Sequence, residues 1–295
     1  VLAGQTVCGV NPLGLRIGFV LAGAALIVLT ETLARRAGCD AKTSVIAAMV
    51  MLGHVQLSLS ATRAMPDVLQ SLFMLVSAIG AVELLLHDKP RRTAAWWLWI
   101  GAGLAVATKG MLAVVFLGYV AAWLGATRRR DGAWRAMVYP PAIIVGVAIA
   151  AWWYVTMMMM YGHVLVDQFV YDQVAVPVSL RWVRPAYQIP MMLGAFAVIF
   201  LPWTLALSLL RLKRAPRDVA GTREKWFAHF ALGWALVLAV VFGMGTHVTF
   251  RYIFVASPLV AVMVAGLFAR IDAAQRDRIL RRVGSLLAAS LAVLA

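Results

Sequence analysis

The chain has 295 residues, of which 63% are apolar and 13% charged, and its formal net charge is +15. Soluble domains average about 45–50% apolar and about 25% charged residues, so the composition excludes an ordinary soluble domain and indicates an integral membrane protein. Runs of the length that crosses a bilayer, about 17–25 residues, recur along the chain, and the short alternating segments of an outer-membrane barrel do not. The basic residues are dispersed in short loops, which favours contact with membrane lipids over nucleic acid.

Ten apolar runs predict membrane-spanning helices at residues 13–34, 44–61, 67–87, 94–108, 110–126, 136–161, 188–210, 227–246, 252–269 and 283–295. We therefore expect an all-α, polytopic integral membrane protein with about ten transmembrane helices, forming a single transmembrane domain over residues 1–295. The longest loop on the outer side is predicted at 162–187. Because the chain starts with Val1 and stops inside an apolar run, we expect it to be incomplete at both ends.

Residues 94–126 allow two interpretations, either one overlong helix or two short spans that turn at Thr108-Lys109-Gly110. A single helix would place the cluster Arg128–Arg130 on the side opposite to the other basic loops. Two spans keep all these loops on one side, and Gly110 suits a turn. We therefore predict two short spans.

Basic residues are distributed very unequally between the two sides of this topology. Of the 27 basic residues, 21 fall on one side, which the positive-inside rule identifies as cytoplasmic: Arg35, Arg36, Lys42, Lys89, Arg91, Arg92, Arg128, Arg129, Arg130, Arg135, Arg211, Lys213, Arg214, Arg217, Arg223, Lys225, Arg270, Arg276, Arg278, Arg281 and Arg282. Cys39 lies on this side and Cys8 on the outer side, so the two cysteines should not pair.

The remaining charges on the outer side are candidates for function, because positive charge is disfavoured there. The six basic residues are Arg16, Arg63, Lys109, Arg181, Arg184 and Arg251, and the same side holds Asp67, Asp167, Asp172 and His163. A cluster drawn from these cations would suit a phosphate or pyrophosphate, since Arg binds phosphate through its planar fork and Lys as a point charge.

Each candidate also has a structural interpretation. Arg63 and Asp67 form either part of a site or an interfacial ion pair, and a proline followed by an acid is an ordinary start of a helix. Lys109 either binds substrate or extends from a turn to the membrane surface. Arg181 and Arg184 either bind a donor phosphate or contact lipid headgroups. A lone His163 is more often a hydrogen-bonding residue than a metal ligand.

Five segments, in this order, resemble membrane glycosyltransferases of the GT-C fold, in particular the aminoarabinose-transferase-like and protein-mannosyltransferase-like family. They are ATRAMPDVLQSLFMLVSAIGAVELL (residues 61–85), ATKGMLAVVFLGYVAAWL (107–124), WWYVTMMMMYGHVLVDQFVYDQV (152–174), FLPW (200–203) and RYIFVASPLVAV (251–262). The resemblance implies transfer of a sugar, with inversion, from a polyprenyl-phosphate-sugar donor to a lipid or glycan acceptor. It also implies a bacterial inner (plasma) membrane location with a periplasmic active face.

The resemblance also implies roles for individual residues. Asp67 and Arg63 are the catalytic candidates, the donor phosphate would be bound by Lys109, Arg181, Arg184, Arg251 and Tyr252, and many family members carry a divalent metal ion, for which His163, Asp167 and Asp172 are candidates here. The family's principal catalytic acid lies in a first outer loop, which is expected before Val1. The stretch YDQVAVPVSL (171–180) lacks the Arg that the family often carries there, and Arg181 or Arg184 would replace it.

Two other classes of function are compatible with the sequence. A transporter or flippase of a lipid-linked anion would also need outer-side cations, although such proteins often contain internal repeats, and the sequence shows none. A catalytically silent, truncated homologue would keep the fold without the principal acid. The clustering of unusual charges at one side favours chemistry at a membrane surface.

Overall fold

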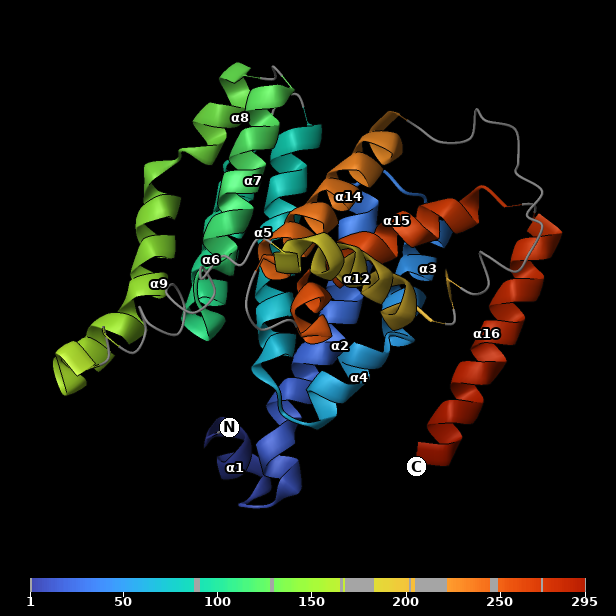
Figure 1. Ribbon diagram of the computed structural model, residues 1–295, viewed down its shortest axis with the longest axis horizontal. Coiled ribbons are helices and arrows are strands. Elements are labelled where there is room, and N and C mark those ends of the chain that lie inside the picture. The colour runs from blue at the N-terminus through green and yellow to red at the C-terminus, as the bar shows by residue number, and fades with distance from the viewer. Residues whose placement is uncertain are drawn as a thin grey trace.

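The computed structural model describes residues 2–87, 91–127, 130–164, 167, 183–201, 203–204, 222–244, 249–271 and 273–294. Over these ranges the protein is built from helices joined by turns and short loops (Figure 1). In chain order the helices are α1 (Leu2–Cys8), α2 (Pro12–Arg36), α3 (Ala41–Leu52), α4 (Val55–Thr62), α5 (Pro66–Leu86), α6 (Arg92–Lys109), α7 (Leu112–Ala126), α8 (Arg130–Met137), α9 (Pro140–Tyr161), α12 (Val183–Ile199), α14 (Thr222–Gly243), the 3₁₀ helix η3 (Phe250–Ala256), α15 (Ser257–Ala269) and α16 (Ala273–Leu294).

Five helical segments of the described chain are long and apolar enough to cross a membrane. They are α2, α5, α9, the Arg223–Gly243 part of α14, and Arg251–Ala269, which joins η3 to α15. The consecutive helices α3 and α4 pass the same test as one broken span. The chain is therefore a multi-pass, all-α membrane protein, as the sequence predicts.

The turn predicted between two short spans is confirmed. Helix α6 ends at Lys109, and Gly110 follows with a φ of +89°. Residues with a side chain rarely adopt a positive φ, so a glycine suits this position. Gly110 therefore ends α6 and allows the chain to turn back into α7.

One predicted span is broken in the structure. Residues 44–61 were expected to form a continuous helix, but α3 and α4 meet at an angle of 56°. Gly53 ends α3, and the following His54 has an extended backbone, with φ −82° and ψ 113°. Because a glycine lowers helix stability at this point, the apolar run divides into two helices.

Helix α5 lies inside the bundle, with 78% of its most apolar stretch buried by protein, whereas the corresponding stretch of α9 is 6% buried. Figure 1 shows α9 at one edge of the bundle and α16 at the other. Side chains such as Trp152 and Met159, which are 57% and 83% exposed, cover α9. An apolar surface of this kind suits contact with lipid.

Glycines determine how closely α5 and α6 approach. A Cβ on Gly80 would lie 2.4 Å from the backbone nitrogen of Leu98, and one on Gly101 would lie 2.4 Å from that of Ser77. Small residues allow helices to pack this tightly in membranes. The hydroxyl of Ser77 also donates to the Leu98 carbonyl at 2.9 Å. In this antiparallel register the start of α5 comes opposite the end of α6.

The bundle has two ends that differ in their charged side chains. At one, here called the Asp67 end, α5 starts and α6 finishes. At the other, here called the Arg36 end, α2 finishes and Arg36 forms a salt bridge with Glu83 of α5. Asp67 and Glu83 are sixteen residues apart on one helix, which corresponds to about 24 Å at 1.5 Å per residue.

Candidate functional site at the Asp67 end

Asp67 is held at the first turn of α5. Pro66 occupies the first helical position, and the preceding turn places Ala64 at a φ of +53°. Proline at this position is already in helical geometry, and an acid in the first turn is stabilised by the helix dipole. The side chain of Asp67 is 3% exposed and accepts a hydrogen bond from Nζ of Lys109. A buried carboxylate therefore has its counter-charge on the neighbouring helix.

Lys109 is the last residue of α6 and contacts more than Asp67. Its Nζ lies 4.9 Å from the centre of the Tyr252 ring, and 28% of its side chain is exposed. The attraction between a cation and the face of an aromatic ring holds the ammonium over Tyr252. An ammonium group has three N–H donors, so Lys109 can donate to Asp67 and still donate to an added anion.

Tyr252 lies in η3 and is supported from α14. Its ring stacks on Phe242 with the ring centres 4.8 Å apart and the planes at 29°. Arg251 is exposed, and its guanidinium lies 5.7 Å from the centre of the same ring. Phe242 was not singled out from the sequence, because a phenylalanine inside an apolar span carries no signal of such a role.

Asp67, Lys109, Arg251 and Tyr252 form what we call the Lys109 cluster. They come from α5, α6 and η3, three segments that are far apart in the sequence. The cluster contains two cations and one carboxylate, so its formal charge is positive. Such a cluster, at the end of helices in a membrane protein, can bind an anionic group.

Arg63 is not the partner of Asp67, although one interpretation of the sequence paired the two residues. It is exposed and caps the end of α4, and within the described ranges it forms no salt bridge. A spacing of four residues brings side chains together only within one helix. Here the chain turns between α4 and α5, so the counter-ion of Asp67 is Lys109.

The outer-loop candidates stay predictions. His163 and Asp167 are exposed. Asp172 and Arg181 lie outside the described residues, and so does the side chain of Arg184, although its backbone belongs to α12. Among the described residues, no group of three or more His, Cys, Asp or Glu side chains could hold a metal ion.

Comparison with solved structures shows a shared fold. The structure of ArnT from Cupriavidus metallidurans bound to undecaprenyl phosphate is similar with a TM-score of 0.76 and 20% sequence identity, over 99% of this chain and 52% of the ArnT chain. The apo structure of the same protein gives a TM-score of 0.73 and 18% identity over the same shares. The chain thus spans about half the length of the ArnT structures that it matches.

Sequence comparison identifies the family. No curated protein matches the chain. The family described as dolichyl-phosphate-mannose-protein mannosyltransferase (PMT) matches residues 1–215, which include α5, α6 and the turn between α6 and α7. The chain therefore belongs to the PMT family.

Proposed function

We propose that the protein is a membrane glycosyltransferase that takes its sugar from a polyprenyl-phosphate-linked donor. The single observation that carries the proposal is the position of Lys109, whose ammonium lies between the buried carboxylate of Asp67 and the ring of Tyr252. Membership of the PMT family supports sugar transfer. The similar fold of ArnT, solved with undecaprenyl phosphate, supports a lipid phosphate as part of the donor.

The Lys109 cluster would bind the phosphate of the donor. When the sugar leaves, negative charge develops on the phosphate oxygen that held it, and fixed cations stabilise this charge. Lys109 provides one cation that is already oriented, and Arg251 provides a second from the neighbouring turn of η3. The phenol of Tyr252 adds an O–H donor.

Asp67 would act through Lys109. Its side chain is almost completely buried, and it already accepts a hydrogen bond from Nζ. A carboxylate in that position restricts where the ammonium lies. We therefore assign Asp67 as a positioning residue, and we leave Arg63, which is exposed, outside the cluster.

The reaction would be a displacement at the anomeric carbon. A hydroxyl oxygen of the lipid or glycan acceptor attacks this carbon, the bond to the phosphate oxygen breaks, and the configuration inverts. The phosphate leaves with the bonding electrons and remains bound to the polyprenyl chain. A carboxylate would accept the hydroxyl proton as a general base.

The location of the cluster suits a donor that is itself a lipid. A polyprenyl chain keeps the donor in the membrane, and the Lys109 cluster lies at the ends of membrane-spanning helices. The positive-inside rule assigns the Arg36 end to the cytoplasm. The proposed reaction therefore takes place on the periplasmic face of a bacterial inner membrane.

The test is sugar transfer by purified protein in proteoliposomes that contain a polyprenyl-phosphate sugar labelled in the sugar. We expect labelled acceptor and free polyprenyl phosphate to appear together. Lys109→Met should reduce the rate about a hundredfold, the usual loss when one group that stabilises developing charge is removed. Lys42→Met is the matched control, since Lys42 forms an exposed ion pair with Asp277 at 3.8 Å.

Two results would contradict the proposal. One is an unchanged rate of transfer in Lys109→Met. The other is movement of the labelled donor across the membrane without release of polyprenyl phosphate, which would identify the protein as a transporter of lipid-linked anions.

A further inference from the structure

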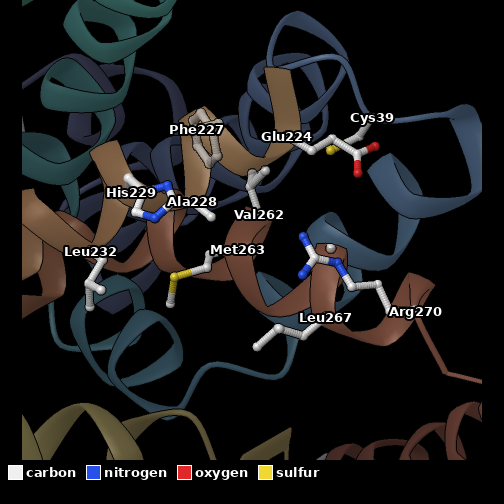
Figure 2. Close-up of a pocket in the computed structure, with 11 residues that line it drawn as sticks. Cys39, Glu224, Phe227, Ala228, His229, Leu232, Val262, Met263, Leu267 and Arg270 are labelled. Atoms are coloured by element: carbon white, nitrogen blue, oxygen red, sulfur yellow. The ribbon is translucent and has the colours of Figure 1, made fainter. Parts of the chain in front are cut away.

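A cavity of about 180 Å³ lies at the Arg36 end, far from the Lys109 cluster. Its walls come from α14, α15 and the loop between α2 and α3, which contributes Cys39 (Figure 2). The cavity is larger than a site for a single water molecule. It shares no residue with the Lys109 cluster, so its occupant would be a second ligand.

The two ends of the cavity differ in charge. Figure 2 shows Cys39, Glu224 and Arg270 at one end, and Leu232, Met263 and the ring of His229 toward the other. Glu224 and Leu232 are eight residues apart on α14, which corresponds to about 12 Å along the helix axis. Leu232 is 47% exposed, so the apolar end opens on the surface that faces lipid. A charged end at the helix termini and an apolar end deeper in the bundle match the polarity of a phospholipid.

The charged end has hydrogen-bonding capacity that the described chain does not use. The Nε atom of Arg270 is buried and has no hydrogen-bond partner among the described residues. Glu224 is an electrostatic neighbour of Arg270, yet within the described ranges the two side chains form no salt bridge. Buried polar atoms are nearly always paired. A ligand between the two side chains would pair both of them.

Glu224 and Arg270 carry opposite formal charges, which indicates a ligand with both signs of charge. A phosphate would accept hydrogen bonds from the Arg270 guanidinium, and an ammonium would donate to the Glu224 carboxylate. An anionic phospholipid could pair its phosphate with Arg270, but it would leave the Glu224 carboxylate without a partner. A choline headgroup has the right charges but no N–H with which to reach the carboxylate.

We propose that this cavity binds a zwitterionic phospholipid with a primary amine in its headgroup, of the phosphatidylethanolamine type, from the membrane leaflet at the Arg36 end. Arg270 binds the phosphate and Glu224 binds the ammonium. One acyl chain lies along Leu232 and Met263 toward the centre of the bilayer. The site is independent of sugar transfer, so failure of the proposed function would leave it unaffected.

Native mass spectrometry of the detergent-purified protein tests the proposal. The probes are dioleoyl phosphatidylethanolamine, phosphatidylcholine and phosphatidylglycerol, added at equal concentrations, and the measured quantity is the fraction of protein that retains each. We expect retention of phosphatidylethanolamine to exceed that of the other two about tenfold, as a hydrogen bond between charged groups gives. Glu224→Gln should abolish this preference while conserving side-chain size.

Two further variants complete the test. Met263→Trp fills the apolar end and should reduce retention of all three lipids without changing any charge. Lys225→Gln is the control for Glu224→Gln, because Lys225 is the next residue on α14, is exposed and does not line the cavity. Stronger retention of phosphatidylglycerol than of phosphatidylethanolamine, an unchanged preference in Glu224→Gln, or unchanged retention in Met263→Trp would overturn the proposal.

Discussion

Two buried carboxylates of α5 are paired with cations on neighbouring helices, one at each end of the bundle. Asp67, 3% exposed, pairs with Lys109 of α6, and Glu83, 8% exposed, pairs with Arg36 of α2. As ion pairs they are alike, and each ties α5 to one neighbour. They differ in what surrounds the cation. Lys109 also lies over the ring of Tyr252, and Arg251 lies beside the same ring. Among the described residues, no aromatic ring lies next to Arg36 in this way.

The comparison distinguishes an ion pair that only stabilises the fold from one that also belongs to a binding site. The Arg36–Glu83 pair balances its own charge and offers no net positive charge for an anion. At the Asp67 end, α6 supplies an ammonium with unused donors, and η3 supplies a second cation and an aromatic ring. We conclude that η3, and not the ion pair alone, makes the Asp67 end a site.

The largest effect is expected from Lys109→Met, which should lower both stability and activity. Removal of one partner of a buried ion pair costs about 3–5 kcal/mol, and partial exposure of Lys109 reduces this to about 2 kcal/mol. Thermal unfolding in detergent measures the stability. In the double variant Asp67→Asn/Lys109→Met the buried charge is gone, so stability should recover while sugar transfer does not. Recovery of both would show that the pair is only structural.

Arg36→Met should lower stability while leaving sugar transfer nearly unchanged. It leaves Glu83 buried without its partner, and since Arg36 is 37% exposed the loss of stability should be about 1–2 kcal/mol. Sugar transfer, measured at a temperature where the variant is folded, should stay within about twofold of the wild type because a loss of about 0.4 kcal/mol or less is expected at the distant site. A large loss of transfer at unchanged stability would remove the distinction between the two ends.

Substitution of Tyr252 tests the ring by itself. Tyr252→Leu removes the cation–π contact with Lys109 and should weaken binding of undecaprenyl phosphate about fivefold, the value for a contact of about 1 kcal/mol. Tyr252→Phe keeps the ring and should bind nearly as well as the wild type. Equal losses in both variants would assign the effect to the phenol and not to the ring.

The smallest effect concerns Cys39 at the Arg36 end. Burial, followed by the charges of Glu224 and Asp40, raises the pKa of the Cys39 thiol to about 12. Only the thiolate is alkylated, so in a Cys8→Ser background alkylation should be slow at pH 8 and accelerate with rising pH. Glu224→Gln removes one of the causes and should accelerate it about threefold.

The same raised pKa predicts how stability depends on pH. The folded thiol stays neutral above pH 9, whereas the thiol of the unfolded chain ionises near its ordinary pKa of 9.0. Stability is therefore fully present below pH 9 and falls as the pH rises toward 12. A Cys39→Ser variant should lose this part of the pH dependence. A rate of alkylation at Cys39 that is independent of pH would contradict the assignment.

The sequence predicts most of the helices because their signal is local. Apolar length marks α2, α5 and α9, and Pro66 marks the start of α5 correctly. The turn at Gly110 follows from keeping all basic loops on one side. The break between α3 and α4 was missed, since Gly53 and His54 lie within an apolar run and helix ends inside such a run have no strong sequence mark.

The candidate site was predicted less completely because it depends on distant contacts. Asp67, Lys109, Arg251 and Tyr252 could be named, but not their arrangement. One of the two interpretations of the sequence paired Asp67 with Arg63, whereas the α5–α6 register pairs it with Lys109, 42 residues away. That register depends on close packing at Gly80 and Gly101, which no local pattern reveals. The charged cavity at Glu224 and Arg270 is lined by three separate segments of the chain, so the sequence does not predict it either.

The most direct test of the central claim is equilibrium binding of undecaprenyl phosphate to the detergent-purified wild type, Lys109→Met and Arg36→Met. Both variants lose one cation from a buried ion pair on α5, so they differ mainly in the end of the bundle that is changed. We predict that Lys109→Met binds about tenfold more weakly, as loss of one charge-assisted contact gives, and that Arg36→Met binds like the wild type. Equal affinity in all three proteins, or equal losses in both variants, would contradict the assignment of the Lys109 cluster as the phosphate site.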